Sequence, residues 1–141
     1  MDKKSATITT AIFGSSDGLV ASIALILATM THGQKVVLAA VLGLLIAEGL
    51  GMAASEFLSD PKRDLRQALI MGGATSLAII LPGLPWTAAS GNAAAVVSGL
   101  IALVLAGLIA WARPGGWTTW VQTYGILIGV SVIAAVAGHF T

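Results

Sequence analysis

Five long apolar runs leave this chain few ways to fold. They cover residues 8–30, 36–58, 67–84, 91–112 and 119–140. Each approaches the length of about 20 apolar residues that a helix needs to cross a bilayer. Hydrophobic residues make up 57% of the 141 positions and charged residues only 9%, against roughly 25% charged residues in soluble domains. The sequence therefore predicts an all-α integral membrane protein, with five transmembrane helices forming a single transmembrane domain over residues 1–141.

The segments between these runs predict how the chain is oriented. With five spans, the segment between the first and second runs lies on one side of the membrane and has one Lys or Arg residue, Lys35. The N-terminal segment and the segments after the second and fourth runs lie on the other side, and they contain six: Lys3, Lys4, Lys62, Arg63, Arg66 and Arg113. Basic residues collect on the cytoplasmic side of membrane proteins. We therefore expect the N-terminus in the cytoplasm and, after five crossings, the C-terminus outside.

Composition also narrows the function classes. The chain has no cysteine, so it forms no disulfide, thiolate metal site or iron–sulfur cluster. Its net charge of +1 does not favour nucleic acid as a partner, and membrane lipid is the expected surrounding. His32 and His139 are expected at the outer surface, in water. Nothing in the sequence indicates an enzyme or a permanently bound cofactor.

Three carboxylates interrupt the apolar runs. Asp17 lies near the middle of the first run, Glu48 near the middle of the second, and Glu56 near its cytoplasmic end. A carboxyl group in hydrocarbon costs at least about 2.5 kcal/mol, so it is rarely kept without a cation, a proton or a partner charge. These three acids indicate a path for a cation.

The second run also supplies a sulfur ligand. Glu48, Met52 and Glu56 are spaced four residues apart, which places them on one stripe of a helix. Carboxylate oxygens with a thioether suit a borderline divalent metal such as ferrous iron better than sodium or magnesium, which favour oxygen alone. We expect Asp17, Glu48, Met52 and Glu56 to be the metal ligands.

Each of these residues also has a simpler interpretation. Asp17 can be protonated and hydrogen-bonded to a neighbouring helix, because desolvation favours the neutral form. Met52 can be ordinary core packing. Glu56 can pair with Lys62 or Arg63 near the headgroups and carry no cation.

Other residues mark the ends and contacts of the spans. Gly14/Gly18 and Gly125/Gly129 are GxxxG pairs, which let helices approach closely. Residues 82–85 contain two prolines, which predict the end of the third span and an outer loop. Four tryptophans lie at predicted span ends and are expected to anchor them at the headgroups: Trp86, Trp111, Trp117 and Trp120.

Three segments resemble one known family. Residues 13–20 (FGSSDGLV) in the first span, residues 51–59 (GMAASEFLS) at the end of the second, and residues 81–85 (LPGLP) after the third are similar to the vacuolar iron transporter family. The likeness covers nearly the whole chain, with its specific signal in the first two spans.

The resemblance implies a five-helix protomer that dimerises, with a metal path between protomers lined by the first two spans. It implies export of ferrous or related divalent ions from the cytoplasm in exchange for protons. Asp17, Met52 and Glu56 match the family's motif positions. The family's upper acid lies about two turns before the methionine, where this chain has Leu44, and Glu48 lies one turn before it. Family members that are well known also carry a glutamate-rich cytoplasmic metal-binding domain between the second and third spans, and this chain is a short form without it.

The sequence thus predicts a transporter of a divalent transition metal, ferrous iron or manganese. The expected mode is metal/proton antiport out of the cytoplasm through the interface of a homodimer, and the compact chain favours a bacterial inner membrane. Two alternatives stay open. One is a small non-transporting membrane protein whose acids are structural, and the other is a proton-coupled transporter of organic cations.

Overall fold

The chain folds into a bundle of helices, seen in a computed structural model that describes residues 3–62 and 64–140. The long helices are α1 (Lys3–Thr29), α2 (Gln34–Ser59), α3 (Leu65–Gly83), α5 (Gly91–Ala112) and α6 (Trp117–His139). Two short helices, η1 (Met30–His32) and α4 (Pro85–Ala88), follow α1 and α3. All five long helices have the length and composition needed to cross a membrane. The predicted all-α architecture, with five helices long and apolar enough to span a membrane, is therefore confirmed.

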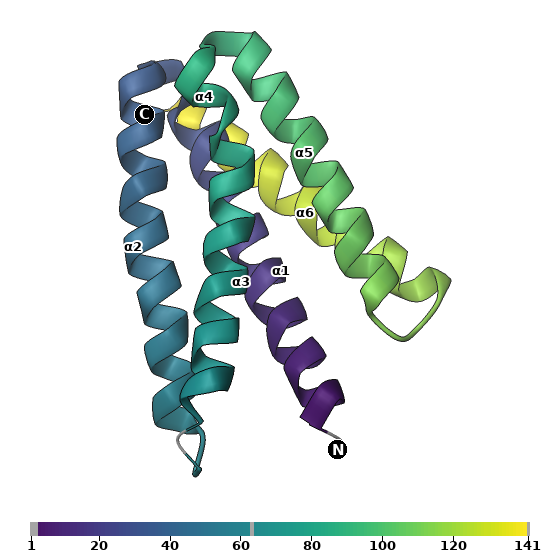
Figure 1. Cartoon of the computed structure of the whole chain (residues 1–141). Coiled ribbons are helices and arrows are strands. Elements are labelled where there is room, and N and C mark those ends of the chain that lie inside the picture. The colour runs from purple at the N-terminus through teal and green to yellow at the C-terminus, as the bar shows by residue number, and fades with distance from the viewer. Residues whose placement is uncertain (1–2, 63, 141) are drawn as a thin grey trace.

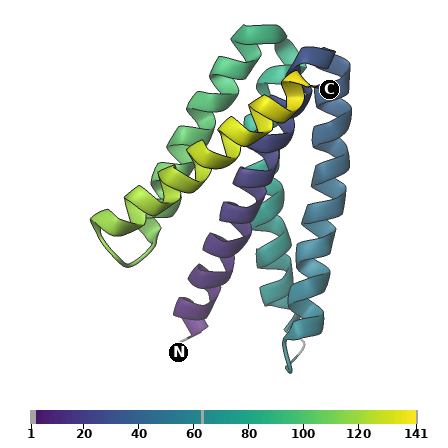
Figure 2. The same ribbon diagram turned by 180° about the vertical axis from the view of Figure 1, so that it is seen from behind.

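The helices form a three-helix layer with a hairpin against it. In Figures 1 and 2, α3 lies between α1 and α2 and packs along both, while α5 and α6 form a hairpin that tilts away from α2. The start of α1 and the α2–α3 turn lie at one end of the bundle, called here the N-terminal end. η1, α4 and the end of α6 lie at the opposite, C-terminal end.

Glycines on α1 allow the close contact with α3. A Cβ atom added to Gly14 would lie 2.6 Å from the carbonyl oxygen of Met71. A Cβ atom on Gly18 would overlap the carbonyl oxygen of Thr75. The backbones of the two helices touch at these points, so the first GxxxG pair brings α1 against α3 as expected.

Proline 82 is the next-to-last residue of α3, so the helix ends within residues 82–85 as predicted. Because proline has no N–H, the carbonyl of Ala78 loses its usual helical donor. The hydroxyl of Ser22 on α1 lies 3.3 Å from that carbonyl and 3.0 Å from the carbonyl of Leu19, so its single hydrogen is shared between them and partly replaces the missing hydrogen bond. α3 ends at Gly83, and the predicted loop to α5 contains a short helix, α4, that begins at Pro85.

Trp86 corrects a second expectation. It is not a headgroup anchor, because its side chain is fully buried. Its Nε1 donates to Ser98 Oγ at 3.1 Å, Ser98 Oγ donates to the carbonyl of Pro82 at 2.6 Å, and Gln34 Nε2 donates to the carbonyl of Trp86 at 2.6 Å. Pro85 begins α4 and turns the chain back over the bundle. The indole therefore points inward, with its polar atom paired.

The other tryptophans behave more nearly as expected. Trp111 is 78% exposed and Trp117 is 81% exposed, and both flank the turn between α5 and α6. Trp120 is partly buried and stacks on Tyr124, with ring centroids 6.1 Å apart. An indole at the end of a span suits the headgroup region.

The turn between α2 and α3 is organised by two aspartates. Asp60 accepts the backbone N–H of Lys62 at 2.9 Å and that of Asp64 at 3.0 Å, and these bonds hold the pKa of Asp60 below its ordinary value of 3.8. Asp64 caps α3 by accepting the N–H of Arg66 at 2.9 Å. Arg63 lies outside the described residues.

Candidate functional site

The packing of α2 on α3 sets the direction of three predicted ligands. Gly49 lies against Ser76, and a Cβ atom on Gly72 would be 2.7 Å from the Cβ of Ala53, so Gly49 and Ala53 face α3. Glu48 precedes Gly49 by one position and Met52 precedes Ala53 by one position. Each is therefore turned by about 100° from the α3 contact. Glu56, one turn further, continues the same stripe.

Asp17 has the same relation to α3. It precedes Gly18, which faces α3. Because α1 and α2 run in opposite directions on the two flanks of α3, a step back of one residue turns both helices toward the same side of the layer. Leu19 follows Gly18 and packs in the cluster with residues of α5 and α6. The four predicted ligands are thus turned to the side of the layer that faces away from α5, and α6 crosses this side only near the C-terminal end, at Ala28 of α1.

None of the three carboxylates has a partner among residues 3–62 and 64–140. Asp17 is exposed, and Glu48, Met52 and Glu56 are partly exposed. No hydrogen bond or ion pair reaches the side chain of Asp17, Glu48 or Glu56, and the expected alternative of a Glu56–Lys62 pair is not formed in the part of the chain that the structure describes.

A single copy does not assemble a closed metal centre from its acids. Within the described residues, no group of three or more His, Asp or Glu side chains is close enough to hold a metal ion. The structure brings Glu48, Met52 and Glu56 onto one stripe of α2 and turns Asp17 to the same side from α1. It leaves both sets of ligands open to the outside of the chain.

The other half of the α1–α2–α3 layer is apolar. At the C-terminal end, a buried cluster closes the space between the helices: Ile26, Val37, Val41, Ile79, Trp86 and Ala94. Leu44 packs against this cluster. The predicted ligands begin one turn beyond it, at Glu48, and extend toward the N-terminal end.

The tilt of the α5–α6 hairpin brings an arginine beside the middle of α1. Arg113 directly follows α5, yet it lines a small cavity of about 50 Å³ together with Ser16 of α1. Its Nη1 donates to Thr123 Oγ1 at 3.4 Å. Asp17 is at the middle of α1 but near the loop end of the hairpin. The sequence suggested Arg113 only as a loop charge, because helix tilt leaves no signal in the spacing of apolar residues.

No protein-family model, no curated protein and no solved structure matches this chain. The residues that suggest a function are therefore those of the chain itself. Asp17, Glu48, Met52 and Glu56 offer three carboxylates and one thioether on the same side of one layer. This donor set suits a borderline divalent cation.

Proposed function

We propose that the chain is a transporter of a divalent transition-metal ion, ferrous iron or manganese. It would export the ion from the cytoplasm in exchange for protons, through a path between two copies of the chain in a bacterial inner membrane. One observation carries the proposal: three carboxylates within membrane-spanning helices are turned to the same side and have no partner among the described residues.

Energetics supports a second copy opposite this side of the layer. Each carboxylate in hydrocarbon costs at least about 2.5 kcal/mol, so three of them facing lipid would be expensive. A two-fold dimer apposes the same surface of both copies. Asp17, Glu48 and Glu56 would then line an aqueous seam, and every ligand would be present twice.

The order of the ligands supports a direction for the ion. The basic residues of the described chain that lie near the N-terminal end, Lys4, Lys62 and Arg66, favour that end as cytoplasmic. An ion from that side would reach Glu56 first, then Met52, and then Glu48 and Asp17. Protons from the other side would compete for the same oxygens and lower the affinity for the metal.

The resemblance of residues 13–20 and 51–59 to the vacuolar iron transporter family supports the same substrate class. The alternative of structural acids is less favoured, because a structural carboxylate is expected to have a hydrogen-bond partner within the chain. An organic-cation transporter would not need the thioether of Met52. Substitution of Met52 therefore distinguishes that alternative from metal transport.

A flux assay in proteoliposomes tests the proposal. Vesicles containing the full chain receive Fe²⁺, Mn²⁺, Co²⁺ or Zn²⁺ under an imposed pH gradient, and metal uptake and proton movement are recorded together. Asp17→Asn and Met52→Ala should each lower metal-driven proton movement at least about tenfold, equivalent to about 1.4 kcal/mol. Asp64→Asn is the matched control. Position 64 lies in the exposed α2–α3 turn, and Asn can cap a helix as Asp does.

If Asp17→Asn and Met52→Ala behaved like the Asp64 control, the path would be wrong. If no divalent ion moved but a lipophilic cation did, the organic-cation alternative would replace it.

The dimer is tested separately by cross-linking. The chain has no cysteine, so a single introduced cysteine reports one position. Ser55→Cys lies two turns from Glu48 on the same side of α2 and is exposed, and Val104→Cys on α5 is the exposed control. Cross-links at position 55 alone are expected. Cross-links at position 104 alone would place the interface elsewhere.

A further inference from the structure

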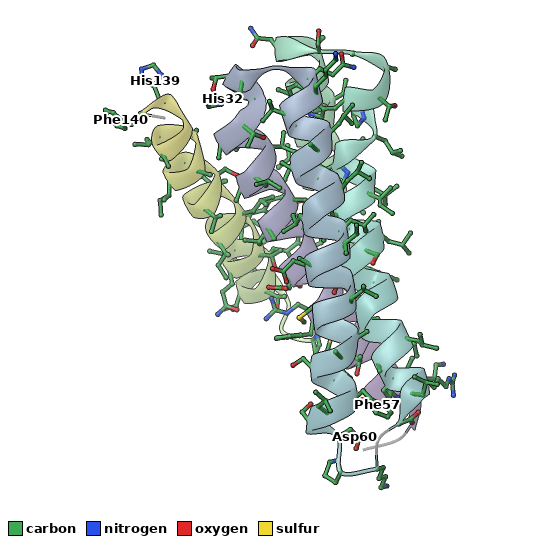
Figure 3. All side chains as sticks on the ribbon, turned by 90° about the vertical axis from the view of Figure 1, so that its left-hand side faces the viewer. His32, Phe57, Asp60, His139 and Phe140 are labelled. Atoms are coloured by element: carbon green, nitrogen blue, oxygen red, sulfur yellow. The ribbon has the colours of Figure 1, made fainter. Side chains whose placement is uncertain are left out.

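The two histidines of the chain lie at the same end of the bundle. His32 ends η1 and His139 ends α6, and the sequence contains no other histidine. Both side chains are exposed. Figure 3 shows both at the C-terminal end, away from Asp60 in the α2–α3 turn. The sequence alone suggested two independent, solvated side chains.

A tight helix crossing brings their backbones together. Gly138 of α6 lies directly on α1, because a Cβ atom added there would be 2.6 Å from the carbonyl oxygen of Ala28 and 2.7 Å from its Cα. His139 follows Gly138, and His32 follows Ala28 by four residues, which is about one helical turn. α6 also packs against η1 itself. The two imidazoles therefore leave neighbouring backbones at one crossing.

The ring of His32 is held by its neighbour. Its Nδ1 lies 3.1 Å from Thr31 Oγ1. When Nδ1–H donates to that hydroxyl, the lone pair of Nε2 is free, and a bond of this kind is what fixes the tautomer of metal-binding histidines. The ring of His139 meets the ring of Phe140 edge-on, with centroids 6.1 Å apart, which leaves its nitrogens free of protein donors in the described chain.

The charges around the two rings are few. The sequence has no Asp or Glu after Asp64, and the nearest acids of α1 and α2, Asp17 and Glu48, lie near the middle of those helices. Lys35, in the first turn of α2, is the nearest basic residue in the sequence to His32. A site here would consist of neutral imidazoles, with water in the remaining positions. Imidazole suits zinc, copper, nickel and iron, whereas calcium and magnesium favour oxygen ligands.

We propose that His32 and His139 together bind a divalent transition-metal ion at the C-terminal end of the bundle. The site needs neither the transport path nor a second copy of the chain. If the proposed transport is also correct, this pair would be a place where an exported ion pauses before it enters the outer solution.

Pulsed EPR with Cu²⁺ tests the pair, since Cu²⁺ binds imidazole most strongly of the common divalent metals and the signal distinguishes one coordinated imidazole from two. The full chain is purified with a tag free of histidine and placed as single copies in lipid nanodiscs. Every imidazole signal then comes from His32 or His139. We expect two imidazoles in the wild type, one in His32→Ala and one in His139→Ala, with Cu²⁺ affinity lowered at least about tenfold in each, or about 1.4 kcal/mol.

Lys35→Gln is the control and should retain both imidazoles. Asp17→Asn should also retain them, although it is expected to abolish flux, so the two proposals can fail independently. A wild type with a single coordinated imidazole, or a single-histidine variant with unchanged affinity, would overturn the site. Both substitutions lie at exposed helix ends, and an unchanged unfolding midpoint will exclude a general loss of structure.

Discussion

Two adjacent glycines of α3 should respond in opposite ways to the same substitution. A Cβ atom on Gly72 would lie 2.6 Å from the carbonyl oxygen of Gly49 and 2.7 Å from the Cβ of Ala53, whereas a Cβ atom on Gly73 would have no neighbour within 4 Å. We expect Gly72→Ala to push α2 away from α3. Gly73→Ala should leave this contact intact.

The magnitude follows from the contact atoms. Each substitution gains about 0.8–1.0 kcal/mol of helix propensity, and this gain cancels when the two variants are compared. The steric cost remains for Gly72 alone. A backbone carbonyl and a Cβ atom cannot rotate away, so the cost should be that of overpacking, about 1–3 kcal/mol. Gly72→Ala should therefore be about 5- to 150-fold less stable than Gly73→Ala in its unfolding equilibrium constant.

Reversible unfolding by sodium dodecyl sulfate in mixed micelles, followed by tryptophan fluorescence, measures this difference. A second readout is metal flux. The displacement of α2 would move Glu48 and Met52 relative to Asp17, so flux should fall in Gly72→Ala and persist in Gly73→Ala. Equal stability of the two variants, or a less stable Gly73→Ala, would refute the packing of α2 on α3.

Three further outcomes are expected. Met52→Leu should lower metal flux at least about tenfold, or about 1.4 kcal/mol. Met71→Leu is the control: Met71 is buried in α3, and because the swap conserves volume the flux should be retained. Equal losses of flux in the two variants would contradict a ligand role for Met52. Trp86→Phe removes the donor to Ser98 Oγ and should lower the free energy of unfolding by about 1 kcal/mol, so an unchanged value in the same micelle assay would contradict that bond. The lowered pKa of Asp60 gives the α2–α3 turn stability that is present above pH 3.8 and lost as pH falls through that pKa. In Asp60→Asn this acid-dependent loss of amide protection, measured by hydrogen exchange, should disappear.

The long helices could be predicted because apolar runs and membrane thickness specify them almost alone. Their ends were less accurate. α1 begins at Lys3, five residues before the predicted start of the first span, through a segment rich in hydroxyl groups. Thr9 Oγ1 donates to the carbonyl of Ser5 at 3.0 Å, so its hydroxyl is satisfied by the helix itself. A polar side chain that donates a hydrogen bond to a backbone carbonyl of its own helix does not interrupt that helix.

The contacts between helices could not be predicted from the same patterns. Gly14/Gly18 packs on α3, whereas Gly125/Gly129 has the same spacing and open space around both residues. The GxxxG motif indicates that a close helix contact is possible but does not identify the partner helix. Trp86 shows the same limit, because its inward direction depends on the turn at Pro85 and on the Ser98 hydroxyl of α5, which accepts a hydrogen bond from the indole.

The placement of the candidate site did follow from the sequence in one respect. The four-residue spacing of Glu48, Met52 and Glu56 predicts one stripe whatever the packing of α2. That Asp17 turns to the same side depends on two further facts, the antiparallel course of α1 and α2 and the glycines that face α3. Only the three-dimensional arrangement supplies these.

The distribution of polarity along this layer constrains any transport cycle. The predicted ligands lie between the middle of the layer and its N-terminal end, and an apolar cluster that includes Trp86 closes the C-terminal half. Gln34 of α2 and Ser98 of α5 both bond to Trp86, so α4 ties two spans together at the closed end. An ion can leave through that end only if the cluster separates, which defines a closed and an open state of the bundle. A bound ion shifts the equilibrium between these two states only if it binds them with different affinity. Loss of metal binding and loss of opening should therefore be separable. Substitutions at Asp17 should change ion affinity, whereas substitutions at Trp86 should change the rate of release while affinity from the N-terminal side is retained.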